Sequence, residues 1–338
     1  MVNCVLSCNF CLENILSLPC SVVVPNYNGE ELLPHLMASL EEQYGLDLEV
    51  IIVDNGSTDQ SRATVPESVR WIQLDYNTGF AYAVNRGLEA ASHPYIFLVN
   101  NDMVLETDAL TRLVSYLNEY HEYGFAQPKV RFLNRKDTIN TIGDVWSVYG
   151  LAIQKGFGEK DTGQFNDIRE IFSPTGGAAL YRKSMLDEVG LFDENFVSYL
   201  EDVDLGFRMR LAGYRGALVP ESVIYHTFQA TFSKIPNLSR FYITRNNSFL
   251  VIKNLPTGLV IKYSPHLLVG LLRVLIVYIK DRCIMILFKI NISLLKHLFY
   301  LFQQRRRIQR ARRISNHKLE QWFLRERPFP ILFWKKVH

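Results

Sequence analysis

Short apolar runs alternate with longer polar and mixed segments through the first hundred residues of the chain. Three of these runs end at Val24, Val53 and Val99, and a weaker one covers residues 69–74. Runs of this length, bounded by polar residues, are typical of strands in a parallel sheet that is covered on both faces. The pattern therefore predicts four buried strands in this part of the chain.

The segments between these runs carry helical signals. A helix is predicted over about residues 30–42, and the small residues between 77 and 91 suit a helix packed closely on a sheet. Ser57 and Gln60 have the spacing of a capping box, which predicts a further helix after the second strand. Strands and helices that alternate at such short spacing favour an α/β fold with right-handed crossovers, a Rossmann-like half.

Polar side chains follow three of the predicted strands at the point where each strand ends. Asn26 follows the first strand, Asp54 ends the second, and Asn100, Asn101 and Asp102 follow the fourth. Open α/β sheets bind ligands at the carboxyl ends of their strands, so we expect these side chains to converge on one crevice. The alternative interpretation is that the two acids only cap the helices that follow them.

Two familiar nucleotide motifs are missing from the sequence. No G-x-G-x-x-G follows the first strand and no G-x-x-x-x-G-K-[ST] occurs, which disfavours a dinucleotide oxidoreductase and a P-loop enzyme. The remaining possibility is a nucleotide-binding crevice whose contacts come from side chains rather than from a glycine-rich loop. In such a crevice, a carboxylate on the second strand can accept from a base imide or a ribose hydroxyl, and Asp102 can hold a divalent cation against phosphates.

Six segments of the chain occur in the order and at the spacing of one enzyme family. They are VVVPNYNG, IIVDNGSTD, NTGFAYAVNRG, YIFLVNND, TGGAALYRKSMLDEVGLFDENF and EDVDLGFRMRLAGYRGALVPES. Together, over about residues 21–249, they resemble a family-2 inverting glycosyltransferase, especially its bacterial rhamnosyltransferase-like branch. The resemblance implies the GT-A fold, which is an α/β fold with a Rossmann-like nucleotide-binding half and a mixed central sheet.

The resemblance also implies which residues bind the donor. Pro25, Tyr27 and Asp54 match positions that hold the base and ribose of a nucleoside-diphosphate sugar. Asn77 and Gly79 match positions that close the pocket.

A metal site is implied by the same resemblance. Asp102 matches the last acid of the family's D-x-D motif, which binds Mg²⁺ or Mn²⁺ bridging the diphosphate. Asn100 departs from the motif, because an amide stands where the first Asp would be, so Asn100 and Asn101 are expected to orient the donor instead. His226 matches the family's histidine after the last core strand, a second protein ligand to the metal. A single histidine in an apolar strand is more often a structural residue, which is the alternative here.

Three acids, Glu201, Asp202 and Asp204, are crowded at the start of a predicted amphipathic helix. The helix dipole stabilises acids at such a position, and this structural role is the alternative to a chemical one. Inverting transfer needs a general base to deprotonate the acceptor hydroxyl, and the resemblance places Asp202 in that role. Glu201 is expected to tune the base, since a neighbouring like charge raises a carboxyl pKa. Asp204 is expected to pair with Arg208.

Two further features lie between these motifs. Gly176 and Gly177 match the family's G-G motif, where the backbone must approach the sugar or the acceptor closely. Residues 134–166 are polar, glycine-bearing and irregular, which predicts a variable loop on the acceptor side.

The last third of the chain is strongly apolar from residue 259 to 302, but basic residues interrupt it. No uncharged run approaches the roughly 18–20 residues that span a bilayer. The basic residues form two sets near helical stripe spacing, which predicts amphipathic helices lying in an anionic membrane surface, reinforced by the arginine run 305–313. Packing on the catalytic core and nucleic-acid binding are the alternatives. The two sets are Lys262, Arg273 and Lys280, and Arg282, Lys289 and Lys296.

The net charge of +3 conceals an uneven distribution. Residues 253–338 carry 18 Lys and Arg against 3 Asp and Glu, whereas the first 252 residues carry 19 against 31. An acidic catalytic half makes nucleic acid a poorer partner than an anionic membrane surface.

The amino-terminal segment carries little functional signal. Four of the five cysteines fall in the first twenty residues, and Cys8 and Cys11 form a lone C-x-x-C, which favours reduced, incidental cysteines over a disulfide or zinc site. Residues 1–18 lack the basic start and clean apolar run of a signal peptide, so a cytoplasmic location is expected. We expect a leader of uncertain order over 1–20, a glycosyltransferase domain over 21–250 and a basic amphipathic helical region over 251–338.

These features together predict an inverting glycosyltransferase at the cytoplasmic face of the cell membrane. By resemblance, it transfers L-rhamnose from dTDP-L-rhamnose to a growing, lipid-linked bacterial glycan. A transferase that uses UDP-galactose or another UDP-hexose is the enzymatic alternative. An inactive nucleotide-sugar-binding or assembly protein is the alternative from another class, and the presence of both Asp102 and Asp202 argues against it.

Overall fold

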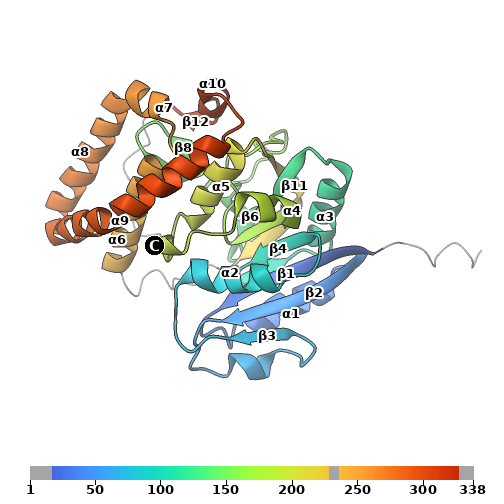
Figure 1. The fold of residues 1–338 in the computed structure, drawn as a ribbon. Helices are drawn as coiled ribbons and strands as arrows, with labels where there is room; N and C mark the ends of the chain where they lie inside the picture. Colours follow the sequence, from blue (N-terminus) through green and yellow to red (C-terminus); the bar gives the residue numbers. More distant parts are fainter. Residues whose placement is uncertain (1–16, 228–235, 327–338) are drawn as a thin grey trace, which may run out of the picture.

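The computed structural model describes residues 17–227 and 236–326 (Figure 1). Most of the predicted leader, with Cys4, Cys8 and Cys11, lies outside the described residues. Cys20 and Cys283 are both free thiols.

A nine-stranded mixed sheet forms the centre of the molecule. Its strand order is β3-β2-β1-β4-β10-β6-β11-β5, with β7 paired to β6. The first four strands run parallel, β10 runs antiparallel to both of its neighbours, and β11 runs parallel to β6. The strands are β1 (Leu18–Asn26), β2 (Leu46–Asp54), β3 (Arg70–Gln73), β4 (Tyr95–Val99), β5 (Met103–Leu105), β6 (Tyr123–Phe132), β7 (Arg135–Thr141), β10 (Ala178–Arg182) and β11 (Arg215–His226).

The predicted Rossmann-like half is confirmed. The four expected strands are β1 to β4, and the two expected helices are α1 (Leu33–Glu41) and α2 (Phe80–Ala90). The predicted capping box is wrong, because only a short 3₁₀ turn, Ser61–Thr64, follows β2. The Ser57 hydroxyl instead accepts from the backbone N–H of Asn28 and donates to Asp54, so it joins the loops after β1 and β2.

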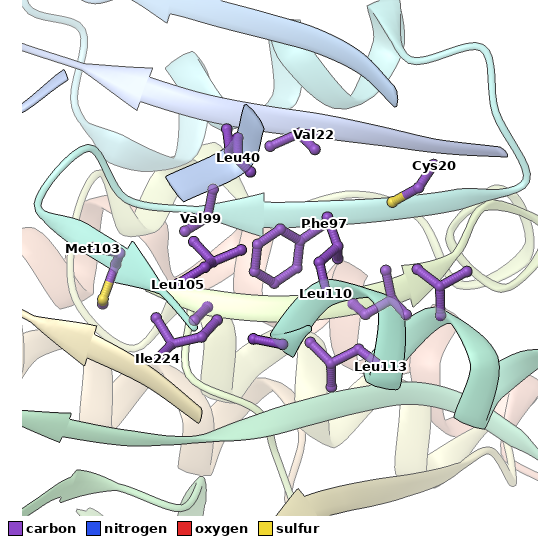
Figure 2. Packing of buried hydrophobic residues seen from close by; sticks show 14 of the residues in the cluster. Cys20, Val22, Leu40, Phe97, Val99, Met103, Leu105, Leu110, Leu113 and Ile224 are labelled. Atoms are coloured by element: carbon purple, nitrogen blue, oxygen red, sulfur yellow. The ribbon is translucent and has the colours of Figure 1, made fainter. Parts of the chain in front are cut away.

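Helices cover both faces of this sheet, which explains why its strands read as continuous apolar runs. Successive side chains of a strand point to opposite faces. Val22 and Val24 of β1 therefore pack with α1 and α3 (Ala109–Glu119), whereas Val23 packs with α2 and α5 (Glu201–Leu211). Figure 2 shows the first of these cores, in which Phe97 of β4 lies among Leu110, Leu113 and Leu105.

The prediction that residues 134–166 form an irregular loop is wrong. This segment contains β7, β8 (Asp144–Ser147) and β9 (Leu151–Gln154), and β12 (Phe323–Leu324) joins the last two in a second, three-stranded sheet. Ile139 and Trp146 are fully buried there, but so are Thr141 and Ser147. The hydrophobic pattern did not reveal these strands, because polar residues such as Thr141 and Ser147 are buried and hydrogen-bonded in them.

The C-terminal region is helical and shares a core with the catalytic half. Phe249 and Leu301 pack with Trp146, Phe196 and Phe207 in a third hydrophobic cluster. The expected boundary near residue 250 falls inside α6. The remaining helices are α4 (Lys183–Val189), α6 (Pro236–Lys253), α7 (Thr257–Lys262), α8 (Ser264–Lys280), α9 (Ile284–Ala311) and α10 (Asn316–Glu320).

The predicted basic stripes are only partly present. Lys262 lies at the end of α7 and pairs with Glu320 (2.5 Å), and Arg273 of α8 lies over the ring of Tyr149, so the first set is not one exposed stripe. The lysines of the second set, by contrast, are exposed on α9.

Basic residues interrupt every apolar run of this region, as noted from the sequence, but this does not by itself exclude a spanning helix. Among the described residues, α9 is long and apolar enough to cross a membrane by length and composition, although Lys289 and Lys296 interrupt its apolar sequence. A core helix of a soluble protein passes the same test, so this property alone does not decide the matter.

Candidate active site

The carboxyl ends of β1, β2 and β4 meet at one edge of the sheet, as the sequence predicted. Asn26 and Asp54 are partners in the β1–β2 register, and Asn26 Nδ2 donates to Asp54 Oδ1 (2.8 Å). Asn101 Nδ2 donates to Asn26 Oδ1 (2.8 Å). An unbroken chain of side-chain hydrogen bonds therefore links three strand ends.

Asp54 is buried, and hydrogen bonds already occupy both of its carboxylate oxygens. It accepts from Asn26, from the backbone N–H of Ser57 (2.9 Å), from the Ser57 hydroxyl and from Gln73 Nε2 (2.7 Å). These contacts tie together the ends of β1, β2 and β3. To contact a base or a ribose, Asp54 would have to exchange one of these partners.

The loop before α2 lies beside this edge and is held by a residue that the sequence reasoning missed. Asn55 Nδ2 donates to Asn77 Oδ1 and to the carbonyl of Gly79, both at 3.2 Å, and Asn55 Oδ1 accepts from the backbone N–H of Thr78 (2.8 Å). Asn55 follows Asp54 directly in the IIVDNGSTD segment, and this position at a strand end could have marked it as a candidate site residue. The structure therefore places Asn77 and Gly79 next to the end of β2.

Two of the expected donor residues lie at the rim of this edge. Pro25 is half-buried within β1 opposite Val53, and the ring of Tyr27 is 46% exposed. An exposed aromatic ring at this position can stack on a planar base. A pocket opens nearby, lined by Leu74, Asp75, Tyr76, Thr78 and Tyr82.

Asp102 and His226 lie together at the end of β11. His226 Nε2 and Asp102 Oδ2 are 2.9 Å apart, and His226 Nδ1 is 3.3 Å from Asn140 Oδ1. Asp102 Oδ1 and Asn100 Oδ1 are both buried and have no hydrogen-bond partner. Among the described residues, no group of three or more His, Cys, Asp and Glu side chains is arranged to hold a metal ion.

The two unpartnered oxygens suit a hard divalent cation, but they supply only part of its coordination sphere. Mg²⁺ and Mn²⁺ prefer oxygen ligands, and a buried oxygen without a partner is costly unless something binds it. Asp102 and Asn100 each offer one such oxygen, so the remaining ligands would come from elsewhere.

A Gly-Gly turn connects this edge to the predicted base. The backbone N–H of Asn100 donates to the carbonyl of Gly177 (2.9 Å), and the N–H of Gly176 donates to Asp202 Oδ2 (2.7 Å). A Cβ on residue 176 would lie 3.3 Å from the Cβ of Asp202 and 3.4 Å from a ring carbon of Phe80. Glycine therefore permits the close approach of this turn to the first turn of α5.

The environment of Asp202 favours a carboxyl with a high proton affinity. Burial raises the pKa of Asp202, and hydrogen bonds from the backbone N–H groups of Gly176 and Val203 only partly offset this effect. Burial, followed by the charge of Asp202, raises the pKa of Glu201 well above its usual range. The charge effect between the two acids thus acts on Glu201, and the expected tuning of Asp202 by Glu201 stays a prediction.

A third acid in this neighbourhood was missed. Burial and the charges of Asp202 and Glu201 raise the pKa of Asp144 well above its usual range. Asp144 lies on β8, where its backbone pairs with Ser173, and Ser173 Oγ donates to the carbonyl of Asp202. The only signal was an acid next to a glycine in a segment interpreted as a loop.

Asp204 lies two residues after Asp202 on α5, so its side chain leaves a different side of the helix from that of Asp202, and its environment is structural. It pairs with Arg208 (2.8 Å), as expected, and also with Lys253 (2.8 Å), while Asn254 Nδ2 donates to it (2.8 Å). Glu201 and Asp204 are thus buried and Asp202 is half-buried, and the ion pairs of Asp204 give it a structural role.

The comparisons with known proteins bear on this arrangement. The sequence model of Glycosyl transferase family 2 matches residues 21–190, which includes the three strand ends and the Gly-Gly turn. Glu201, Asp202 and His226 lie beyond the matched residues.

Several curated relatives are named as a polymerase, a polysaccharide synthase or a glycosyltransferase. The chain is 30% identical over 143 residues to a teichoic acid poly(glycerol phosphate) polymerase of Staphylococcus epidermidis, covering 36% of this chain and 20% of that protein. It is 23% identical over 212 residues to a poly-beta-1,6-N-acetyl-D-glucosamine synthase of S. epidermidis, covering 61% and 49%. It is 26% identical over 235 residues to an N-acetylglucosaminyl-diphospho-decaprenol L-rhamnosyltransferase of Mycobacterium tuberculosis, covering 61% and 75%. The matched part of the chain thus covers a fifth of the length of the first of these relatives and about half of the length of the second.

Solved structures share the fold. GalNAc-T7 aligns with a TM-score of 0.55 at 14% identity over 70% of this chain and 48% of that chain. Staphylococcus aureus TarS aligns with a TM-score of 0.50 at 20% identity over 71% and 40%. The GT-A fold that the resemblance implied is confirmed. Because the family model matches half of the chain, including the three strand ends, the chain belongs to glycosyl transferase family 2.

Proposed function

We propose that this protein transfers a sugar from a nucleoside-diphosphate donor to a growing bacterial surface glycan, with inversion at the anomeric carbon. Family membership supports sugar transfer, and the names of the relatives support a cell-wall or surface glycan as the acceptor. The observation that carries the proposal is the Gly176-Gly177 turn. One glycine is bonded to Asp202 and the other to Asn100, two residues before Asp102.

Asp202 is the proposed general base. The acceptor hydroxyl attacks the anomeric carbon as Asp202 takes its proton, a bond forms between the acceptor oxygen and that carbon, and the bond to the diphosphate oxygen breaks. Each Asp202 oxygen accepts one backbone N–H and keeps a lone pair for the hydroxyl. A raised pKa strengthens the carboxylate as a base, which suits this step.

The donor side is proposed at the strand ends. Tyr27 offers an exposed ring to the base, and Pro25 shapes the rim beside it. Asn77 and Gly79 close the pocket, and Asn55 fixes them in place. Asp54 contributes by holding the ends of β1 and β2 in register.

A divalent cation fits the other end of the donor site. Asp102 Oδ1 and Asn100 Oδ1 would hold it, while the contact between His226 and Asp102 fixes the orientation of the carboxylate. Mg²⁺ or Mn²⁺, when bound there, would neutralise charge on the diphosphate leaving group. Asn101, which bonds to Asn26, keeps the turn after β4 in place.

For the donor we favour dTDP-L-rhamnose. The M. tuberculosis relative is named as an L-rhamnosyltransferase that acts on a lipid diphosphate, and the alignment covers three quarters of it. A UDP-hexose remains the alternative, supported by the N-acetylglucosamine polymer synthase among the relatives.

A panel of nucleotide sugars tests the proposal. The purified full-length chain is incubated with dTDP-L-rhamnose, UDP-galactose, UDP-glucose and UDP-N-acetylglucosamine, with Mn²⁺ or with EDTA. Nucleoside diphosphate release and thermal shift are then measured. We expect one donor to stabilise the protein and to be turned over in the presence of Mn²⁺. A protein that binds a donor but never releases the diphosphate, with any lipid-linked acceptor, would indicate the inactive binding protein instead.

We also propose that α8 and α9 place the enzyme on the cytoplasmic face of the membrane. Exposed apolar side chains recur on α9 with three- and four-residue spacing, which forms one continuous stripe on a helix. Figure 1 shows α8 and α9 on the side of the molecule away from β3. The stripe consists of Met285, Phe288, Ile292, Leu295, Phe299 and Phe302.

The exposed lysines and the buried face of α9 favour a helix that lies in the interface. Lys289 and Lys296 flank the stripe, where they can reach anionic headgroups. Leu301 and Ile308 of the same helix are buried against the protein core. A helix that packs on the protein along one face can present only its other face to lipid, which suits an interfacial helix better than a spanning one.

A further inference from the structure

The segment that leads into the proposed base has an unusual backbone. Val197, Tyr199 and Leu200 have φ angles of 65°, 70° and 66°. Residues with side chains rarely adopt this left-handed conformation, and a β-branched valine does so least readily. Leu200 is the N-cap of α5, so this strained segment immediately precedes Glu201 and Asp202.

Helix α6 holds this segment from the C-terminal side. Asn246 is fully buried, and its Nδ2 donates to the carbonyl oxygens of Phe196 (3.1 Å), Ser198 (3.0 Å) and Tyr199 (2.6 Å). All three carbonyls belong to the strained segment or to the residue just before it. One amide therefore satisfies backbone groups that the irregular conformation leaves without partners in secondary structure.

Arg245 fixes the orientation of that amide. Its Nε donates to Asn246 Oδ1 (2.9 Å), which turns the Asn246 nitrogen toward the carbonyls. Its Nη2 donates to the carbonyls of Asn195 (2.8 Å) and Phe196 (2.9 Å). The guanidinium is itself buried among aromatic rings, including that of Phe249 at 4.8 Å.

The other side of the segment contacts the donor side of the site. The carbonyl of Val197 accepts from the N–H of Ala81 (3.1 Å), and the hydroxyl of Ser198 accepts from the N–H of Phe80 (3.3 Å). Gly79 has a positive φ, and a Cβ there would lie 2.7 Å from a methyl carbon of Val197. The segment thus lies between the first turn of α2 and helix α6.

We propose that Asn246, oriented by Arg245, is a positioning residue for sugar transfer. By holding the carbonyls of Phe196, Ser198 and Tyr199 it fixes the left-handed segment and so places Asp202 against Gly176. Helix α6 lies outside the residues that the family model matches, yet it completes the site. This inference rests on the proposed function, in which Asp202 is the base.

The proposal has a consequence for pH dependence. Hydrogen bonds from Gly176 and Val203 lower the pKa of Asp202 against the effect of burial, so a displaced α5 start should raise that pKa further. The titratable groups that face Asp202 are Glu201 on the same helix, Asp144 on β8 and Tyr181 on β10, whereas Asn246 bonds to Arg245 and to backbone carbonyls. A change at residue 246 therefore acts through the backbone.

The test compares two neighbouring buried amides in the full-length chain. Asn246→Ala removes the donor to the segment, whereas Asn247→Ala removes an amide of α6 that accepts from the N–H of Ala152 and donates to the carbonyl of Ile243. Transfer from dTDP-L-rhamnose, or from the UDP-sugar that the panel identifies, is followed as nucleoside diphosphate release across pH. Arg245→Lys, which keeps the cation but loses the fork, is measured in parallel and carries the test if Asn246→Ala does not fold.

We expect Asn246→Ala to lower kcat by about 10²-fold, the order of loss that a misplaced catalytic group produces, with little change in donor KM. We also expect the acid limb of its kcat/KM profile to move to higher pH, and Arg245→Lys to shift the limb in the same direction. Asn247→Ala should lower only the thermal stability. Wild-type kcat in a folded Asn246→Ala variant, or an acid limb that does not move in either Asn246→Ala or Arg245→Lys, would overturn the inference. Retained turnover in Asp202→Asn would instead overturn the proposed base, so the two failures are distinguishable.

Discussion

Lys253 is a buried cation whose removal should strongly destabilise the protein. Its ammonium lies 2.5 Å from Asp193 and 2.8 Å from Asp204, and all three side chains are nearly inaccessible to solvent. Lys253→Met would keep an unbranched apolar side chain, one atom shorter, but leave two buried carboxylates without this partner. Breaking a buried pair from one side typically costs about 3–5 kcal/mol, and we expect a loss of that order at pH 7.

The pKa of Asp193 gives an independent magnitude. Burial is the largest single effect and raises the pKa, but the charge of Lys253 and the hydrogen bonds from Lys253, Asn195 and Tyr300 together outweigh it and lower the pKa from 3.8 to about 2. A depression of this size corresponds to roughly 2 kcal/mol of stability. Because the folded pKa is depressed, this contribution is fully present above pH ~4 and is lost as the pH falls toward 2.

Urea unfolding of wild type and Lys253→Met at pH 7, 5 and 4 measures both effects. The difference in unfolding free energy should be largest at pH 7 and should shrink at acidic pH, because protonation relieves the unpaired acids in the variant. Lys253→Met combined with Asp193→Asn should recover part of the loss. Lys183→Met, which removes an exposed pair with Asp187, should cost at most about 1 kcal/mol. A loss from Lys253→Met no larger than this control, or one independent of pH, would refute the reasoning.

Three further predictions concern the site and the C-terminal helices. Asp102→Ala should weaken nucleotide-sugar binding at least about tenfold in Mn²⁺ but little in EDTA, measured by calorimetry; equal losses would indicate a direct or structural role. Burial raises the pKa of Glu201, so its ionisation at higher pH costs stability, and Glu201→Gln should raise the melting temperature relative to wild type more at pH 8 than at pH 5; a pH-independent difference would contradict this. Phe288→Ser with Phe299→Ser should reduce sedimentation with anionic vesicles, since each exposed phenyl ring offers about 1.5–3 kcal/mol of burial, while binding by wild type should decrease only partly in high salt. A wild-type protein that is dimeric in solution and does not bind vesicles would instead identify the stripe as an interface between two copies.

The Rossmann-like half was predictable because its physics is local. Strands β1 and β4 are covered on both faces, so burial appears in the sequence as unbroken apolar runs, and the polar residue after each run marks the edge where ligands bind. Asn26, Asp54 and Asn101 could therefore be placed together from the sequence alone. The Gly-Gly turn and Asp202 came from family resemblance, since nothing local brings residue 176 to residue 202.

The missed features depend on contacts that are distant in sequence or on buried polar groups. Strands β7 to β9 were hidden because residues such as Asn140 and Ser147 are buried, which a hydrophobic pattern cannot register. Asn246 bonds to the segment before α5 although the two are fifty residues apart in the sequence, and no periodicity of the sequence predicts such a contact. Lys262 has stripe spacing from Arg273, but a break between α7 and α8 separates them.

Asp202→Asn is the most direct test of the proposed chemistry. The variant keeps the shape of the side chain and its acceptor oxygen but cannot take a proton from the acceptor hydroxyl. Nucleoside diphosphate release in the presence of acceptor should fall by at least about 10²–10⁴-fold, while calorimetry should show donor binding close to that of wild type. Turnover near the wild-type rate in a variant that binds donor normally would contradict the assignment of Asp202 as the base.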